Sequence, residues 1–368
     1  MPSRVLVTGA SGFIGSHLCG ALAEAGHSVR AMTRHPETYT GIGEPVRGDV
    51  GDPDSLRAAL EGVEAAYYLV HSLDSSDFED KDAEAARAFG AAAAQAGVGQ
   101  IIYLGGLGED DSDLSAHLRS RRQVETLLGE AGAPVTVLRA AVVVGHGGIS
   151  WELTRQLVHR LPVMIAPRWV NTRTQPIALP DVIRYLVGVL GTPQALGAVY
   201  EVGGPDVLRY VDMMRRASLI QEGRDLRLVG VPFLTPHLSS LWLAFVTDVD
   251  LATARTLIDS MTSEVVVHDT SIRDVVPGET LGYDDAVRLA LADRAREQAG
   301  TRRHDPPSAE SAPPGESAPS GESAPSAASA PPAASAPPAA PAQPAAPAPP
   351  AAPAEGRPEA AGPRDAGR

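Results

Sequence analysis

The chain has 368 residues but only one cysteine and one lysine. The single cysteine, Cys19, excludes an intramolecular disulfide and a cysteine-rich metal site, and we expect no metal ion. Lysine and arginine together number 31, and all of them except Lys81 are arginine. A mechanism that requires a lysine must therefore use Lys81.

Large apolar side chains are missing from the last part of the sequence. Between Asp305 and Arg368 there is no aromatic residue and no Val, Ile, Leu or Met, while more than half of the 32 prolines fall there. Such a segment cannot bury enough apolar surface to offset its ordering entropy. We therefore expect residues 1–298 to fold and residues 299–368 to form a disordered Pro/Ala-rich tail.

Long apolar runs and excess positive charge are also lacking. The longest apolar stretch, Val231–Val249, is interrupted by Pro232, Pro236 and Asp248, so it is a poor membrane span. No signal-peptide core precedes the first strand-like segment. The net charge of −14 argues against nucleic acid and anionic lipid as partners. A soluble cytoplasmic protein is expected, with its oligomeric state open.

Strand-like and helix-like segments alternate through the first half of the chain. Examples are the strand pattern Arg4–Thr8, the helical spacing of Ile14–Ala25 and the strand pattern Ser28–Met32. This order predicts a Rossmann-type, doubly wound α/β fold with a parallel sheet. Beyond Gly145, helical pieces are separated by Pro-rich connections, which predicts a small, mainly helical cap lobe built mainly from about residues 146–298. Those pieces are Trp151–Arg160, Pro180–Leu190, Tyr210–Ile220, Leu251–Met261 and Tyr283–Ala295.

A glycine-rich turn follows the first predicted strand and opens the first predicted helix. Glycines there permit a tight turn and close backbone approach to a pyrophosphate, and the helix N-terminus offers free N–H groups. The turn predicts a dinucleotide site formed by Gly9, Ser11, Gly12, Phe13, Ile14 and Gly15.

The end of the second predicted strand indicates which dinucleotide is bound. An NAD site usually carries an acid there, whereas this chain has Arg34 and no acid before Glu37. A guanidinium pairs well with a 2′-phosphate, so we expect NADP(H) rather than NAD(H), the alternative being an exposed surface arginine. Asp49 and Val50 are placed to meet the adenine, although Asp49 also suits an ordinary turn.

Val70, His71 and Ser72 follow the fourth predicted strand. At the carboxyl end of that strand they are expected to approach the ribose on the nicotinamide side. Capping of the loop is the alternative role of His71 and Ser72.

Several of these motifs resemble the extended and atypical short-chain dehydrogenase/reductase superfamily. They are Thr8-Gly-Ala-Ser-Gly-Phe-Ile-Gly, Gly48-Asp49-Val50, Tyr68-Leu-Val-His-Ser, Leu138–Gly145 and Gln175-Pro-Ile with Asp181. Over residues 1 to about 298 the chain looks most like the NmrA-like branch, which is similar to the NADPH-holding accessory subunit of respiratory complex I.

The resemblance implies Ser-Tyr-Lys chemistry, which this chain does not retain. The serine position is Gly105-Gly106, the tyrosine position aligns with His117, and the lysine position aligns with Arg121. His117 and Arg121 are four residues apart on one predicted helix, so they share a face and are the candidate catalytic pair. A neighbouring arginine would favour neutral imidazole. The alternative is a pair of solvated side chains on an exposed face.

Other segments are weaker candidates for the substrate site. Arg139 follows a strand and either faces the nicotinamide or is a buried structural arginine. Arg168-Trp169 and Arg173-Thr174-Gln175 either contribute to a substrate cavity or form a surface rim. The apolar stretch Phe233–Val246 is interpreted as core, with a lid or a partner surface as alternatives.

Together these features predict an NADP(H)-binding atypical reductase or dehydrogenase without the usual triad. It would pass hydride to a small, apolar carbonyl or quinone-like substrate. The main alternative is a non-catalytic NADP(H) redox sensor or accessory binding protein. Isomerase or epimerase chemistry also fits the extended family's fold, but it depends most on the Tyr and Lys that are replaced here.

Overall fold

A computed structural model of the chain describes residues 2–71, 78–108, 114–161, 163–166, 168–230 and 258–304. All of them belong to one compact unit, Met1–Pro306. The predicted stretch Phe233–Val246, most of the predicted helix Leu251–Met261 and the predicted tail beyond His304 lie outside the described residues. The domain boundaries therefore stay a prediction.

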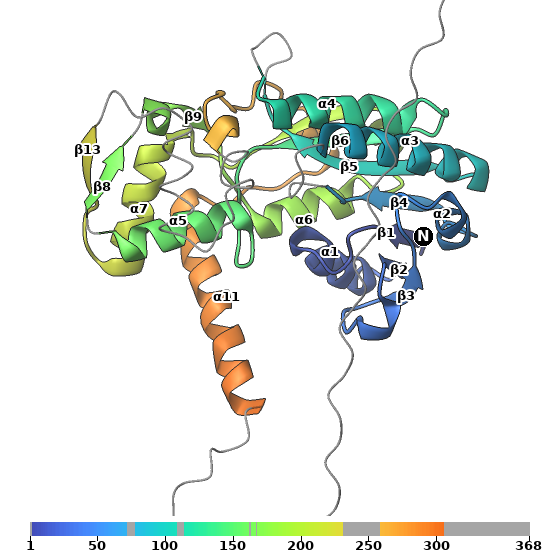
Figure 1. Ribbon diagram of the computed structural model, residues 1–368, viewed down its shortest axis with the longest axis horizontal. Helices are drawn as coiled ribbons and strands as arrows, with labels where there is room; N and C mark the ends of the chain where they lie inside the picture. The colour runs from blue at the N-terminus through green and yellow to red at the C-terminus, as the bar shows by residue number, and fades with distance from the viewer. Residues whose placement is uncertain are drawn as a thin grey trace, which may run out of the picture. The chain divides into compact units, whose positions relative to one another are not determined.

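A seven-stranded sheet forms the centre of the fold, and every pair of neighbouring strands in it is parallel (Figure 1). The strand order is β11-β6-β5-β4-β1-β2-β3, so the direction of winding reverses between β1 and β4. The doubly wound parallel sheet is confirmed. Its strands are β1 (Arg4–Val7), β2 (Ser28–Thr33), β3 (Glu44–Arg47), β4 (Ala65–Tyr68), β5 (Gln100–Gly106), β6 (Val135–Ala140) and β11 (Val199–Val202).

Helices cover both faces of this sheet (Figure 1). One face packs against α1 (Phe13–Glu24) and α6 (Leu179–Gly188). The other packs against α2 (Pro53–Ala59), α3 (Phe78–Ala96) and α4 (Ala116–Gly129). Because both faces are covered, the central strands β1, β4 and β5 are almost entirely buried, whereas the edge strand β3 keeps the exposed residues Glu44 and Arg47.

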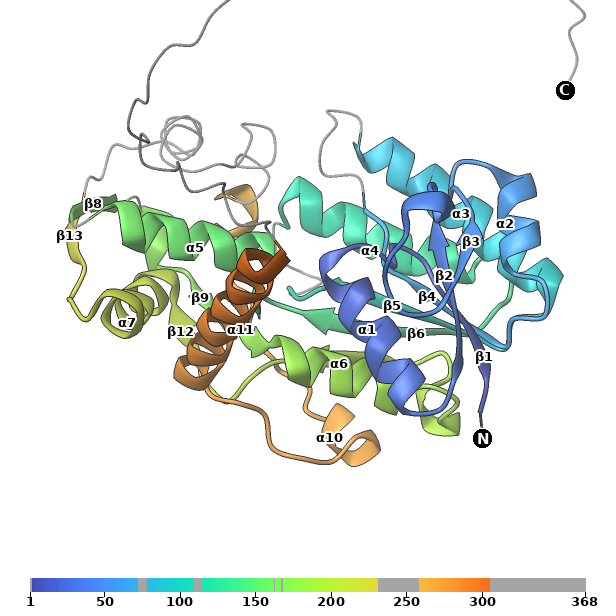
Figure 2. The ribbon, with the colours of Figure 1, turned by 90° about the horizontal axis from the view of Figure 1, so that it is seen from below.

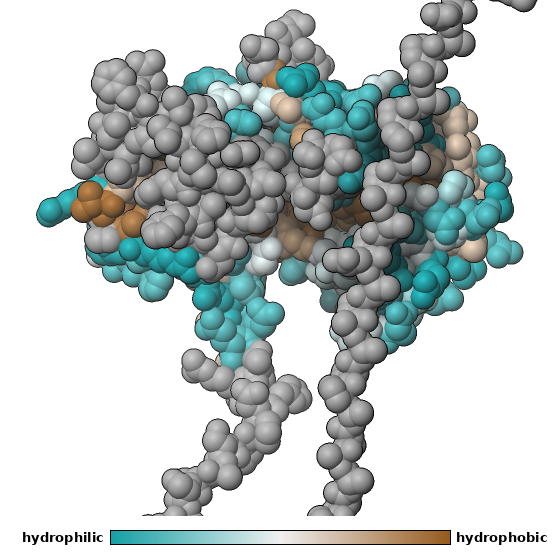
Figure 3. Space-filling view, in the orientation of Figure 1, coloured by the Kyte–Doolittle hydropathy of each residue, from teal (hydrophilic) through white to brown (hydrophobic). Residues whose placement is uncertain are grey.

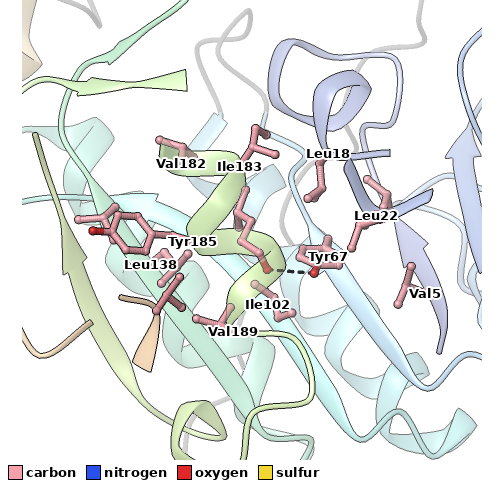
Figure 4. Packing of buried hydrophobic residues seen from close by; sticks show 14 of the residues in the cluster. Val5, Leu18, Leu22, Tyr67, Ile102, Leu138, Val182, Ile183, Tyr185 and Val189 are labelled. Carbon is pink, nitrogen blue, oxygen red and sulfur yellow. Dashed lines mark hydrogen bonds between the residues drawn. The ribbon is translucent and has the colours of Figure 1, made fainter. Parts of the chain in front are cut away.

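The alternation of side chains along each strand divides the core into two halves. Val5 and Val7 pack on the side of α1 and α6, whereas Leu6 packs on the side of α2 and α3. In β4, Tyr67 belongs to the first half and Tyr68 to the second. The buried Tyr67 hydroxyl donates a hydrogen bond of 3.0 Å to the carbonyl oxygen of Leu186 in α6, as Figure 4 shows. This bond satisfies a phenol that would otherwise be buried without a partner.

A second core lies among α5 (Ile149–Arg160), α7 (Tyr210–Glu222) and α11 (Tyr283–His304), which gather on one side in both ribbon views (Figures 1 and 2). The mainly helical lobe is thus confirmed. Three two-stranded pieces accompany these helices: β7 (Val143–Val144) with β10 (Ile177–Ala178), β8 (Val163–Ala166) with β13 (Arg227–Gly230), and β9 (Arg173–Thr174) with β12 (Leu208–Arg209). Short helical turns among the described residues are η1 (Pro36–Thr38), η2 (Arg168–Asn171), η3 (Pro193–Ala195) and α10 (Ile272–Val275).

The chain returns to the main sheet after α5, which the sequence did not reveal. The predicted helix Pro180–Leu190 becomes α6, a layer of the Rossmann sheet, and β11 then pairs with β6. With only four residues, β11 is too short for a clear strand pattern.

The surface drawn in Figure 3 is hydrophilic over the projecting part of α11. Hydrophobic colour gathers near β8, where Val163 is half exposed. Within the described ranges, no helix combines the length and the apolar character that crossing a membrane would need.

Candidate functional site

The glycine-rich turn between β1 and α1 is shaped by backbone contacts that side chains would block. Gly9 has φ +61°, in the left-handed region, and the Gly12 N–H donates a 2.8 Å hydrogen bond to the Gly9 carbonyl oxygen. A Cβ atom at Gly15 would collide with that same carbonyl oxygen. The first turn of α1 is thereby held tightly against the loop.

The N-terminus of α1 is open to an anion. Gly12 is the N-cap residue, no side chain caps the helix, and the first turn contains no acid. Free N–H groups and the positive end of the helix dipole therefore remain available for a phosphate. Phe13 and Ile14 pack against the core instead, so they anchor the helix.

A cavity of about 490 Å³ lies at this helix N-terminus, between the carboxyl ends of β1 and β4 where the winding reverses. Nucleotides bind at that point in doubly wound sheets. Eight of the predicted cofactor residues line the cavity, whereas Phe13, Ile14 and Gly15 do not, and Ser72 lies outside the described residues. The lining consists of Gly9, Ser11, Gly12, Met32, Thr33, Arg34, His35, Gly48, Asp49, Val50, Leu69, Val70 and His71.

Arg34 lies on the wall of the cavity that β2 contributes, with an exposed side chain. Among the described residues no carboxylate pairs with it. The nearby acid, Glu37, accepts from His35 at 3.3 Å and pairs with Arg47 at 3.7 Å. The arginine is thus available to a ligand while the acid is engaged elsewhere.

Asp49 lies both at the cavity and in a hydrogen-bonded turn, while its contact with the adenine stays a prediction. It lines the cavity, and one carboxylate oxygen accepts a 2.9 Å hydrogen bond from the Gly51 N–H. Its own N–H donates to the Ser55 hydroxyl oxygen at 2.9 Å. The turn therefore fixes Asp49 at the cavity edge.

His71 connects this cavity to helices α3 and α4. Its Nδ1 lies 2.6 Å from a carboxylate oxygen of Asp82, and its Nε2 lies 3.2 Å from Nδ1 of His117. The side chains of His71 and Asp82 are only 9% and 7% exposed. Asp82 also accepts a hydrogen bond from Ser120 at 3.5 Å. Two histidines that the sequence placed in different roles thus form one buried chain with an aspartate.

The environment of His117 favours the neutral ring. Burial first, and then the charges of Arg121 and His71, lower the pKa of His117 to about 3, and Asp82 opposes this only in part. At neutral pH the ring is therefore uncharged.

His117 also lines a second cavity, of about 120 Å³, at the junction of the sheet and the cap lobe. Its walls are mostly apolar: Gly106, Leu107, Leu118, Ala140, Ala141, Val142, Ser150, Tyr210, Ser260, Met261 and Val265 complete it. The cavity would hold roughly four water molecules at about 30 Å³ each. The contact between His71 and His117 therefore joins the cavity at the glycine turn to a small apolar one.

Comparison with known proteins agrees with this geometry. A sequence family described as NAD(P)H-binding matches residues 9–160. The (4-alkanoyl-5-oxo-2,5-dihydrofuran-3-yl)methyl phosphate reductase of Streptomyces griseus is 31% identical over 61% of this chain and 75% of its own length. The chain is an atypical short-chain dehydrogenase/reductase.

Two further similarities bear on this assignment. The mitochondrial NADH dehydrogenase (ubiquinone) 1 alpha subcomplex subunit 9 of Arabidopsis thaliana is 25% identical over 75% of each chain. An NADPH-dependent quinone oxidoreductase of Escherichia coli, solved with NADPH, shares the fold with a TM-score of 0.64 at 21% identity, over 78% of this chain and 99% of that one. Pyridine-nucleotide binding is thus a property of the family to which the chain belongs.

Gly105, which is predicted to occupy the position of the family's serine, lies beside a nearly buried ion cluster. A Cβ atom at Gly105 would lie 2.8 Å from a carboxylate oxygen of Glu125. Glu125 accepts from Arg122 at 2.9 Å and from two nitrogens of Arg139, the closer at 2.7 Å. Arg139 lines neither cavity and serves as the buried structural arginine that was one of its two expected roles.

Arg121 lies on the same face of α4 as His117, but its guanidinium interacts with Tyr103. Its Nη1 donates to the Tyr103 hydroxyl at 3.2 Å, and the guanidinium lies 5.9 Å from the centre of that ring. Arg121 lines neither cavity, so its effect on the site comes through its charge.

The segment Arg173-Thr174-Gln175 holds a neighbouring piece of chain in place. Arg173 pairs with Glu264 at 2.6 Å, and the Gln175 side chain accepts from the Val267 N–H at 2.9 Å. Val265, between those two contacts, lines the apolar cavity. The segment therefore shapes that cavity indirectly. The side chains of Arg168 and Trp169 are not among those described.

Asp82 is the site residue that sequence reasoning missed. It lies in a charged run, but it is four residues from Ala86 and seven from Phe89, both of which are buried on the same face of α3. An acidic residue in register with the buried residues of a helix indicates that its carboxylate has a polar partner in the core, because burying an unpaired charge is costly. His71, which follows β4, supplies that partner.

Proposed function

We propose that the protein is an NADP(H)-dependent reductase that transfers hydride to a small apolar carbonyl or quinone-like substrate. The observation that carries the proposal is the contact between His71 and His117. One of these rings lines the cavity at the glycine turn and the other lines the apolar cavity, so the two spaces meet at a single imidazole contact.

The residues of the larger cavity fit a dinucleotide phosphate. The loop Gly9–Gly12 and the open end of α1 would hold the pyrophosphate, and Arg34 would pair with the 2′-phosphate. Asp49 and Val50 would meet the adenine, and Val70 and His71 would meet the ribose on the nicotinamide side. NADPH, when bound, supplies hydride.

The smaller cavity supports an apolar substrate. Its walls are mostly aliphatic. Among the lining residues, the ionisable side chains are the His117 imidazole and the Tyr210 phenol. At neutral pH the uncharged His117 ring would offer an N–H group to a carbonyl oxygen, and the charge of Arg121 would favour the negative charge that develops there. The Streptomyces relative is named a reductase and the structural relative a quinone oxidoreductase, and both names support this reaction class.

The test measures NADPH oxidation with a panel of quinones and aldehydes, together with NADPH binding by fluorescence. The variant His117→Phe removes the N–H and keeps a ring of similar size, and we expect it to lower turnover at least about 100-fold while NADPH still binds. His17→Phe, at an exposed position on α1, is the control. Unchanged turnover in His117→Phe would exclude His117 from the reaction.

A second candidate function is a non-catalytic NADP(H) sensor or accessory subunit. It is favoured because Gly105, His117 and Arg121 would stand where the family has its catalytic Ser, Tyr and Lys. The similarity to an NADH dehydrogenase subunit points the same way. NADPH binding without turnover of any substrate in the panel would select this alternative.

A further inference from the structure

We propose that Asp82, His71 and His117 form a proton relay that delivers a proton at Nε2 of His117 to the oxygen of a substrate in the apolar cavity. The proposal rests on the proposed reductase function. The relay would replace the tyrosine and lysine that this chain lacks. It assigns positioning roles to Asp82 and His71 and leaves His117 as the group that touches the substrate.

With Asp82 ionised and His117 uncharged, two arrangements of protons satisfy these hydrogen bonds. Asp82 accepts from Nδ1 of His71, so that nitrogen carries a proton in both. In the first arrangement His71 is a cation, its Nε2–H donates to Nδ1 of His117, and His117 carries its own proton on Nε2. In the second, His71 is neutral, Nδ1–H of His117 donates to Nε2 of His71, and Nε2 of His117 is bare.

These two arrangements differ by one proton, and that proton leaves from His117 Nε2. Among the described residues this nitrogen makes no hydrogen bond, and the ring lines the apolar cavity. Moving one proton from His71 to His117 and another from His117 to the substrate converts the first arrangement into the second. Both keep the hydrogen bonds that link the three side chains, so the transfer breaks neither of them.

The surrounding charges place the extra proton on His71 rather than on His117. The Asp82 carboxylate, nearly buried and 2.6 Å from His71, stabilises a cation there. Arg121 from α4 and burial keep His117 neutral. Tyr103 from β5 and Tyr68 from β4 also face this group, and burial raises the pKa of both phenols, so they stay uncharged.

The balance of the reaction is complete with the groups named. Two electrons and the hydride hydrogen reach the carbonyl carbon from the nucleotide, and the carbonyl oxygen forms its O–H bond with the proton from His117 Nε2. His117 regains a proton on Nδ1 from His71 Nε2. Solvent reprotonates the neutral pair after the product leaves.

The arrangement differs from a metal site or a simple structural ion pair. The described residues contain no group of His, Cys, Asp or Glu side chains that could hold a metal ion, and these three side chains form a chain of bonds rather than converging on one point. A structural pair of Asp82 and His71 alone would not require the tautomer of His117 to change.

The first experiment follows the ring nitrogens by 15N NMR of histidine-labelled full-length protein without nucleotide. We expect His71 to be protonated on both nitrogens at low pH and His117 to carry its proton on Nε2. As pH rises, one transition should deprotonate His71 and at the same pH move the His117 proton to Nδ1. Independent titration of the two rings, or a His117 tautomer that stays fixed, would overturn the relay.

Variants then connect this transition to turnover. Asp82→Asn should move the NMR transition and the alkaline fall in turnover to lower pH by at least one unit, a tenfold change in the equilibrium. Glu84→Gln removes an exposed carboxylate from the same helix and should move neither. Near-ultraviolet circular dichroism checks the fold, and if Asp82→Asn fails to fold, His71→Gln serves instead and should abolish the tautomer change in His117.

The outcomes separate the two proposals. A coupled transition without turnover of any substrate would support the relay as a proton-binding device and reject the reductase function. Turnover with a pH profile that Asp82→Asn leaves unmoved would support the reductase function and reject the relay.

Discussion

Gly15 in α1 lies so close to the carbonyl oxygen of Gly9 that no Cβ atom fits between them. The contact holds the open N-terminus of α1 against the glycine turn. Five residues further along the same helix, a Cβ atom at Gly20 would meet its nearest neighbour at 3.5 Å, an ordinary contact.

We expect Gly15→Ala to lower the free energy of unfolding by about 1–3 kcal/mol and to abolish NADPH binding, because the helix must shift away from the turn. Gly20→Ala should be neutral or stabilising by up to about 1 kcal/mol, since alanine is the better helix former. Urea denaturation and fluorescence titration with NADPH measure both effects. Equal behaviour of the two variants would contradict the close-contact argument.

The charge of Arg34 should determine the choice of cofactor. We expect the protein to bind NADPH more tightly than NADH, and Arg34→Ala to weaken NADPH binding about 10- to 100-fold while NADH binding stays the same. Arg57→Ala, on α2 and paired with Asp54 at 2.7 Å, is the matched control outside the cavity. Equal affinity of the unmodified protein for NADPH and NADH would contradict the role assigned to Arg34 in selecting the cofactor.

The stability of the fold should fall in mild acid partly because of His117. Its pKa is about 3 in the folded protein against an ordinary value of 6.5, so between these pH values the unfolded chain binds the proton and the folded one does not. Stability therefore rises with pH through this window and is lost as pH falls from about 6.5. We expect His117→Phe to reduce the loss between pH 7 and pH 5 by about 2 kcal/mol. Urea denaturation at both pH values tests this, with exposed His17→Asn expected to change nothing.

The cluster around Glu125 should be a major source of stability. Its side chain is 8% exposed and its single negative charge pairs with both Arg122 and Arg139, so Glu125→Gln would take that charge away from two nearly buried guanidinium groups. We expect a loss of about 3 kcal/mol or more in the free energy of unfolding. Glu130→Gln breaks a pair that is half exposed and should cost less than about 1 kcal/mol. A loss in Glu125→Gln as small as in the control would show that the cluster contributes little.

Most of the nucleotide-binding half was predictable because its signals are local. The glycines between Gly9 and Gly15 are required by backbone geometry inside a segment of only seven residues. The alternation of strands and helices along the chain likewise predicts a parallel sheet. The sequence also predicts that the serine, tyrosine and lysine positions of the family hold other residues, and this stays a prediction. These inferences depend on spacing along the chain and not on which segments meet.

The tertiary structure decided what the sequence could not, because the remaining site is built from contacts between distant segments. Asp82, His71 and His117 come from three separate elements and meet only when α3 and α4 pack on the same face of the sheet. The partner of Arg139 and the return of β11 to the sheet are likewise long-range pairings. The sequence therefore determined where a dinucleotide belongs, whereas packing determined which charged groups are buried together beside it.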